Sequence, residues 1–312
     1  MIRETSATPS PSGDRLGFWL SLVGAVAFSG KAIVVKLLLR EGVDGITSLG
    51  LRMILAAPLF ALMALRGGLG QEKHPRAVLL RIAVLGFSGY YLASTLDFLG
   101  LEHVSASLER LILYVYPTIV LALGRLRGHP PISRRQWIAT VLCYAGVFAA
   151  FGAEAGKSTL ATTRSSHEVL LGAALVLASA VAYAVYIVLS GELVGKVGAL
   201  RLTGWASGAA SVFCIAQFAV VRPERILAPW TWMTPRIFVL CLVNATLCTA
   251  MPMWMVMRGI QGIGSAKAAQ VGMVGPLSTI LLAVLLLGER LTAPMLAGTA
   301  LVLAGIALLS RN

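Results

Sequence analysis

Ten long apolar stretches follow one another along this chain, separated by short polar segments. A helix needs about 20 such residues to cross the hydrocarbon core of a bilayer, so each stretch is long enough to span a membrane. Only 12% of the 312 residues are charged, about half the charged fraction of a soluble domain. The sequence therefore predicts an all-α membrane protein with ten transmembrane helices. The expected spans are residues 17–38, 47–65, 78–99, 105–124, 135–152, 168–190, 201–221, 236–257, 265–287 and 293–310.

Charge and cysteine placement exclude other classes of protein. A net charge of +13 would fit a nucleic-acid partner, but the basic residues lie mostly in short loops and form no run longer than a pair. The four cysteines lie inside apolar stretches, where a disulfide framework would not place them. We therefore expect the lipid bilayer, and no nucleic acid, as the main partner of the chain.

An internal repeat divides the chain. Gly17, followed by Ala25-Val26-Ala27-Phe28, returns 155 residues later as Gly172, followed by Ala180-Val181-Ala182-Tyr183. Because each half would hold five spans, an odd number, the second half must enter the membrane from the opposite side. Such inverted repeats are typical of secondary transporters. We expect two five-helix domains, 1–155 and 156–312. A shift of 159 residues aligns four further pairs, Gly100 with Gly259, Pro117 with Pro276, Thr140 with Thr299 and Gly146 with Gly305.

Lysine and arginine are distributed unequally between the two sides of the expected membrane. With a cytoplasmic N-terminus, 14 of them lie on the inner loops and helix ends and 7 on the outer side. Positive charge accumulates on the cytoplasmic side of membrane proteins. The pattern therefore predicts that both termini are cytoplasmic.

Nucleotide and enzyme sites are not expected. Residues 152–158, GAEAGKS, imitate a phosphate-binding loop, but three residues rather than four separate the glycines. The four histidines lie in loops without a second metal ligand at helical spacing, and an intramembrane aspartate pair is missing because Asp97 is the single aspartate in a span. We expect no cofactor, no metal and no enzymatic activity.

Several short motifs resemble those of one transporter family. Val104-Ser105-Ala106-Ser107 leads into an apolar stretch with Pro117, and Gly288-Glu289-Arg290-Leu291-Thr292 separates the last two spans. Gly298 and Ala304-Gly305-Ile306 follow in the final span. Together with the duplicated five-helix unit, these motifs resemble the EamA-type ten-helix transporters of the drug/metabolite transporter superfamily, over nearly the whole chain.

The resemblance implies a carrier of small organic solutes across a bacterial inner membrane, and many relatives export amino acids or other metabolites. The first half departs from the pattern, because His129-Pro130 stands where the second half has Gly288-Glu289. A proton-coupled importer or antiporter, which would have to use Asp97, Glu109 or Glu192, remains an alternative. A channel-like protein or a membrane scaffold is the alternative outside the transporter class, and the oligomeric state is open.

Six ionisable residues lie in or near the expected spans of the first half, where charge is costly and by default functional. Counting ~1.5 Å per residue, Lys31 lies roughly 10 Å, Arg52 about 9 Å and Glu109 about 6 Å inside the outer boundary. The excess of two positive charges predicts attraction of a substrate carboxylate, with Lys267 in the matching role on the cytoplasmic side. The alternative is structural, with Glu109 neutralising Lys31 or Arg52. The six residues are Lys31, Lys36, Arg52, Asp97, Glu109 and Arg110.

Aromatic residues and prolines complete the expected pathway. A buried tyrosine needs a partner for its hydroxyl, so Tyr90, Tyr91 and Tyr114, with Trp254, indicate either mutual contacts or a cavity that receives substrate. The repeat-related prolines each free a backbone carbonyl inside a helix, and paired interruptions point to a binding site or hinge. We expect the third, fourth, eighth and ninth helices to line the pathway, with hinges at Pro117 and Pro276.

Overall fold

The computed structural model describes residues 11–68, 76–113, 115–126, 134–158, 166–256, 258–259, 271 and 274–310. The regular structure of these residues is helical throughout. The first half contains α1 (Pro11–Arg40), α2 (Gly45–Gly68), α3 (Arg76–Leu85), η1 (Gly86–Leu92), α4 (Ala93–His103), α5 (Ala106–Leu113), α6 (Tyr116–Leu126) and α7 (Arg134–Ser158). The second half contains α8 (Ser166–Val197), α9 (Ala199–Val221), α10 (Pro223–Leu227), η2 (Pro229–Thr231), α11 (Pro235–Ala245), η3 (Thr246–Ala250), α13 (Val274–Leu282), η4 (Ala283–Leu287) and α14 (Ala293–Ser310).

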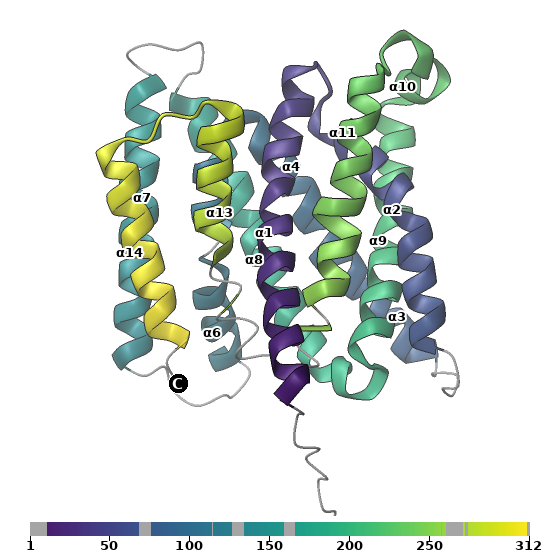
Figure 1. The fold of residues 1–312 in the computed structure, drawn as a ribbon, viewed down its shortest axis with the longest axis horizontal. Helices are drawn as coiled ribbons and strands as arrows, with labels where there is room; N and C mark the ends of the chain where they lie inside the picture. Colours follow the sequence, from purple (N-terminus) through teal and green to yellow (C-terminus); the bar gives the residue numbers. More distant parts are fainter. Residues whose placement is uncertain are drawn as a thin grey trace, which may run out of the picture.

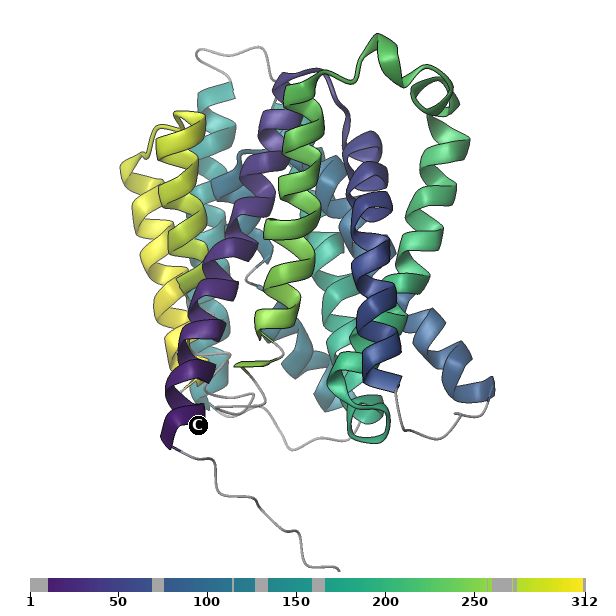
Figure 2. The same ribbon diagram turned by 45° about the vertical axis from the view of Figure 1, so that its right-hand side comes forward.

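The long helices stand side by side in one bundle (Figure 1). The helix α1 begins and α14 ends at the lower end of this view, which we call the terminal end, whereas α10 lies at the opposite end. Both views place α1 between α13 and α11, and α1 packs against each of them (Figure 2). The first helix of the chain is therefore embedded among helices of the second half.

Helix length and composition confirm the expected membrane fold. Seven helical segments of the described chain are long and apolar enough to cross a membrane. Three shorter apolar helices, Trp137–Ala150, Leu277–Leu287 and Ala293–Gly305, cover the other expected spans. Residues 265–270 of the expected ninth span lie outside the described residues. Large apolar side chains such as Phe148 and Leu285 are more than two thirds exposed on the outside of the bundle, as expected where lipid is the solvent.

The two halves pack as inverted repeats. A Cβ atom on Gly100 would lie 3.0 Å from the carbonyl oxygen of Gly172, and one on Gly259 would lie 3.0 Å from that of Gly17. The sequence repeat relates Gly100 to Gly259 and Gly172 to Gly17. The contact of Gly100 in the first half with Gly172 in the second is therefore repeated as the contact of Gly259 in the second half with Gly17 in the first. The second helices of the two halves, α2 and α9, pack against each other, and so do the fifth helices, α7 and α14. These two pairs make the most extensive contacts among the described helices. Small residues allow this close approach of helices in a membrane.

The third helix of each half contains a π-helical turn at an equivalent position. The turn η1 covers Gly86–Leu92, and the 159-residue shift carries this range to 245–251, which encloses η3 at Thr246–Ala250. A π-turn inserts one residue into the helical repeat and occurs frequently at functional sites. The structure thus adds a second pair of equivalent interruptions to the prolines in α6 and α13.

Candidate functional site

Lys31 lies at the centre of a buried charge cluster that joins α1, α4 and α5. Its ammonium donates to the Asp97 carboxylate and lies 3.6 Å from Oε1 of Glu109. Asp97 is 2% exposed and Glu109 is fully buried. The structural alternative, in which Glu109 neutralises Lys31 or Arg52, agrees with this geometry for Lys31, and Asp97 shares the same ammonium.

Arg110 extends the cluster to the second half of the chain. Its Nε atom lies 3.9 Å from Oε2 of Glu109 and donates to the Thr279 hydroxyl of α13 at 3.0 Å. A guanidinium nitrogen also donates to the carbonyl oxygen of Phe28, at 3.4 Å. Lys31 and Arg110 are therefore balanced by the two carboxylates Asp97 and Glu109.

Arg52 is the buried cation of this region without a matching acid. Its guanidinium donates to the Ser94 hydroxyl at 3.1 Å and lies 4.6 Å from the centre of the Phe98 ring. Within the described chain, no carboxylate lies within ion-pair distance of Arg52, and its Nε–H has no hydrogen-bond partner. Arg52 thus carries one of the two positive charges in excess over Asp97 and Glu109, and Lys36, which carries the other, donates to the carbonyl oxygen of Leu101.

The two adjacent tyrosines make aromatic contacts with the second half. The Tyr186 hydroxyl donates to that of Tyr90 at 3.3 Å, with the ring centres 5.0 Å apart. Tyr91 packs against Phe87 and Phe213. The structure places both tyrosines among α8 and α9 rather than around a hollow shared with Trp254.

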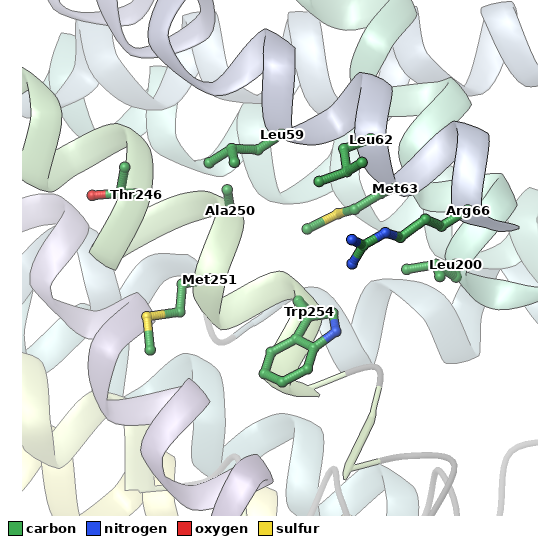
Figure 3. A pocket seen from close by; sticks show the side chains of 9 residues that line it. All are labelled: Leu59, Leu62, Met63, Arg66, Leu200, Thr246, Ala250, Met251 and Trp254. Atoms are coloured by element: carbon green, nitrogen blue, oxygen red, sulfur yellow. The ribbon is translucent and has the colours of Figure 1, made fainter.

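Trp254 lines an apolar hollow of about 230 Å³ between α2 and the helical segment that continues η3 (Figure 3). Arg66 is the charged residue of the described lining, and its guanidinium projects into the hollow near Trp254. The wall combines aliphatic side chains, two methionine thioethers and the indole ring. Such a surface suits an apolar group with a polar end. The full lining is Leu59, Leu62, Met63, Arg66, Leu200, Thr246, Ala250, Met251 and Trp254.

Some of the expected site residues cannot be placed. Tyr114 and Lys267 lie outside the described residues. Pro117 falls in α6 and Pro276 in α13, where the backbone is described and the side chains are not. Their roles as substrate contacts and hinges remain predictions.

Glu289 joins the two motifs that carry the family resemblance. Gly288 ends η4 with a φ of +69°, a left-handed conformation that suits glycine. The Glu289 carboxylate then accepts from the backbone N–H groups of Ala106 at 2.9 Å and Ser107 at 3.4 Å, and from the Ser107 hydroxyl at 2.7 Å. It therefore caps the N-terminus of α5, the helix that carries Glu109 and Arg110. The sequence showed Glu289 as part of a family motif, but it did not indicate that this glutamate caps α5.

A second hollow, of about 590 Å³, opens at the end of the bundle opposite the terminal end. Its acids bind helix N-termini, because Glu102 accepts from the Gly45 N–H at 2.6 Å and Asp44 from the Thr47 N–H at 3.0 Å. Although burial acts to raise it, the pKa of Asp44 is below its usual value because Thr47 and Arg222 stabilise the carboxylate. Arg40 donates to the Leu287 carbonyl oxygen at 2.6 Å, at the end of η4. The charged side chains around this hollow thus form hydrogen bonds with the ends of helices.

Comparison with known proteins identifies the family. The EamA-like transporter family matches residues 15–152 and 170–311. The chain is 32% identical over 272 residues to the uncharacterized transporter YcbK of Bacillus subtilis, covering 86% of this chain and 85% of the relative. It is 28% identical over 220 residues to the uncharacterized inner membrane transporter YicL of Salmonella typhimurium, covering 68% and 66%.

A crystal structure with 17% sequence identity shares the fold, with a TM-score of 0.59 over 96% of both chains. The expected resemblance is confirmed by the two family matches, which together cover most of the sequence. The protein is a multi-pass membrane transporter and not an enzyme, and it belongs to the EamA-like transporter family.

Proposed function

We propose that this transporter is a secondary carrier that exports small organic metabolites bearing a carboxylate, amino acids among them, by alternating access. The observation that carries the proposal is Arg52, a buried guanidinium without a carboxylate partner among the described residues. An intramembrane charge of this kind is costly and marks a substrate pathway. The apolar hollow with Trp254 and Met63 supports a substrate whose other end is aliphatic or aromatic.

The two repeats, residues 1–155 and 156–312, both contribute to the movement in this proposal, because helices of each half are packed among those of the other. In transporters built from inverted repeats, one bundle rocks or gates against another around a fixed site. Repeat-related interruptions, at η1 and η3 and at Pro117 and Pro276, support movement in the third and fourth helix of each half. The chain carries no complete phosphate-binding loop, so a solute gradient is the expected energy source.

Transport by the purified protein is expected to require a carboxylate and no ATP. Proteoliposomes should exchange labelled L-phenylalanine and L-leucine against unlabelled amino acid, while the corresponding amides should exchange at least tenfold more slowly. Protein-free liposomes give the background. Equal exchange of acid and amide, or an absolute requirement for ATP, would contradict the proposal. Release of preloaded amino acid from cells that express the transporter, measured against vector-only cells, tests the outward direction.

Proton coupling is the second candidate, favoured by the pair of buried carboxyls, Asp97 and Glu109, that share Lys31. Carboxyl groups inside transporters commonly relay protons. The same proteoliposomes with an imposed pH gradient distinguish the two mechanisms. Accumulation of L-phenylalanine against its own gradient, abolished by a protonophore and by Glu109→Gln, would support proton coupling, whereas exchange unaffected by the gradient would support simple exchange.

We further propose the bacterial inner membrane as the location and the cytoplasm as the side of both termini, from the unequal distribution of lysine and arginine. The four native cysteines are buried, so introduced thiols can be labelled with little background. In intact cells an impermeant maleimide should modify Trp230→Cys, at the end opposite the termini, and spare Leu126→Cys at the terminal end. Permeabilised cells should label both variants. The reverse pattern in intact cells would overturn the orientation.

A further inference from the structure

Asn244 is a fully buried amide that the bundle does not satisfy. It lies in the last turn of α11, immediately before the π-turn η3, and is 0% exposed. Among the described residues, neither Nδ2 nor Oδ1 has a hydrogen-bond partner, although the Thr249 hydroxyl donates to the Asn244 backbone carbonyl at 2.7 Å. A buried polar group without a partner is costly, and the hydrocarbon around the bundle offers none. A side chain of this kind is suited to bind a ligand that supplies the missing hydrogen bonds.

The segment that carries Asn244, α11 with η3, packs against α1 and α2, the helices that carry Lys31 and Arg52. Cys248 follows Asn244 by one helical turn, and its thiol lies close enough to Arg52 and Lys31 for electrostatic interaction. A Cβ atom on Gly30 of α1 would lie 3.0 Å from the Cys248 sulfur, and α11 packs against both α1 and α2. At ~1.5 Å per residue, Arg52 lies about 10 Å below the start of α2 and Asn244 about 14 Å below the start of α11. Ala245, next to Asn244, and Met53, next to Arg52, belong to one buried apolar cluster, so the two polar residues flank the same part of the core.

We propose that Asn244 and Arg52 bind the α-amino carboxylate of the substrate, an inference that rests on the proposed function and names its site. The Arg52 Nε–H and the Asn244 Nδ2–H groups are donors without partners, and a carboxylate supplies acceptors for both. The Asn244 Oδ1 atom is left to accept from the substrate ammonium. A zwitterionic amino acid therefore satisfies each of these buried atoms at once.

The apolar hollow is lined by residues that follow Arg52 and Asn244 on their own helices, toward the terminal end. Thr246 and Ala250, in the π-turn next to Asn244, belong to its lining, as does Leu59, two turns after Arg52 on α2. A bound amino acid with its polar end at Arg52 and Asn244 can therefore place its side chain at the near end of the hollow, toward Leu59 and Ala250. This arrangement favours large aliphatic and aromatic side chains over charged ones.

The Asn244→Leu variant separates a binding role from a structural one. Leucine has nearly the same size and needs no hydrogen bonds, so the ligand-free variant should unfold in detergent at the wild-type temperature or above it. The same variant should lose the thermal stabilisation given by L-phenylalanine, and its KM for L-phenylalanine exchange should rise at least tenfold. Arg52→Met should lose the same stabilisation. Thr299→Val, which removes a buried hydroxyl bonded to Met295 within α14, is the control and should keep L-phenylalanine binding.

The probes L-phenylalaninamide and 3-phenylpropionate test separately the binding of the carboxylate and the binding of the ammonium. The amide lacks the carboxylate for Arg52, and 3-phenylpropionate lacks the ammonium for Asn244 Oδ1, so each should bind the wild type more weakly than L-phenylalanine. A fall in the unfolding temperature of ligand-free Asn244→Leu would show that Asn244 is a structural partner and would overturn the proposal. An unchanged KM in that variant would overturn the site and leave the proposed function standing. If wild-type protein moves no carboxylate at all, the proposed function fails, and the site fails with it.

Discussion

The Lys31→Met variant is expected to accumulate in the membrane at a small fraction of the wild-type level. Among the described residues, the replacement leaves Arg110, at 3.9 Å from Glu109, as the cation within ion-pair distance of the two buried acids Asp97 and Glu109. Removing one partner of a buried ion pair costs about 3–5 kcal/mol. Folded proteins are stable by only about 5–15 kcal/mol in total, so the loss is a large share.

A second replacement should restore the stability of this variant. In Lys31→Met/Asp97→Asn the cluster is again neutral, so membrane abundance and the unfolding midpoint in detergent should return most of the way to the wild type. Arg236→Met is the matched control, because it breaks the exposed ion pair with Glu41 at 3.1 Å, and such pairs contribute at most about 1 kcal/mol. A Lys31→Met variant as abundant and as stable as Arg236→Met would refute the structural role of Lys31.

The Glu289→Ala variant is expected to lower stability by about 2 kcal/mol and to slow transport. It removes the acceptor for two backbone N–H groups and for the Ser107 hydroxyl at the start of α5. Loss of a helix cap costs about 0.5–2 kcal/mol, and a buried donor left without a partner costs about 1–3 kcal/mol. Transport should suffer as well, because α5 positions Glu109 and Arg110 in the charge cluster.

The measurement is the unfolding midpoint in detergent, together with the L-phenylalanine exchange rate in proteoliposomes. Glu289→Gln keeps an acceptor oxygen and loses the charge, so it should fall between Glu289→Ala and the wild type. The control is Glu224→Ala in the exposed turn α10, which should behave as the wild type does. Equal stability of Glu289→Ala and Glu224→Ala would show that the cap contributes nothing.

The membrane fold was predictable because its determinants are local. Each apolar stretch has the length that the bilayer requires, and this length does not depend on which helices become neighbours. The repeat was visible because close helix contacts need small residues at fixed places, as Gly100 and Gly259 illustrate. Lengths and spacings therefore indicated ten helices and two inverted halves.

The pairing inside the bundle was not predictable in the same way, because it depends on how each helix is rotated. The sequence placed Lys31, Arg52 and Glu109 at similar depths without indicating that Arg52 would face Ser94 and Phe98 while Lys31 took both acids. The sequence left open whether Tyr90 makes mutual tyrosine contacts or lines a cavity, and its contact is with Tyr186. One missed signal was present: Asn244 is a lone amide in an apolar run, and such a residue in a membrane span marks a site or a helix contact.

The π-turn η1 fixes the direction in which the following side chains point. It lies at Gly86–Leu92, directly before the α4 residues Ser94, Asp97 and Phe98, which contact Arg52 and Lys31. Each α-helical residue advances a helix by roughly 100°, so replacing the π-turn by a regular α-helix with the same number of residues would rotate α4 by about that angle relative to α3. Asp97 would then point away from Lys31, although the number of apolar residues in this helix would still be sufficient for a membrane span. Loss of the π-turn, a change of conformation that no hydropathy profile can register, would thus dismantle the charge cluster.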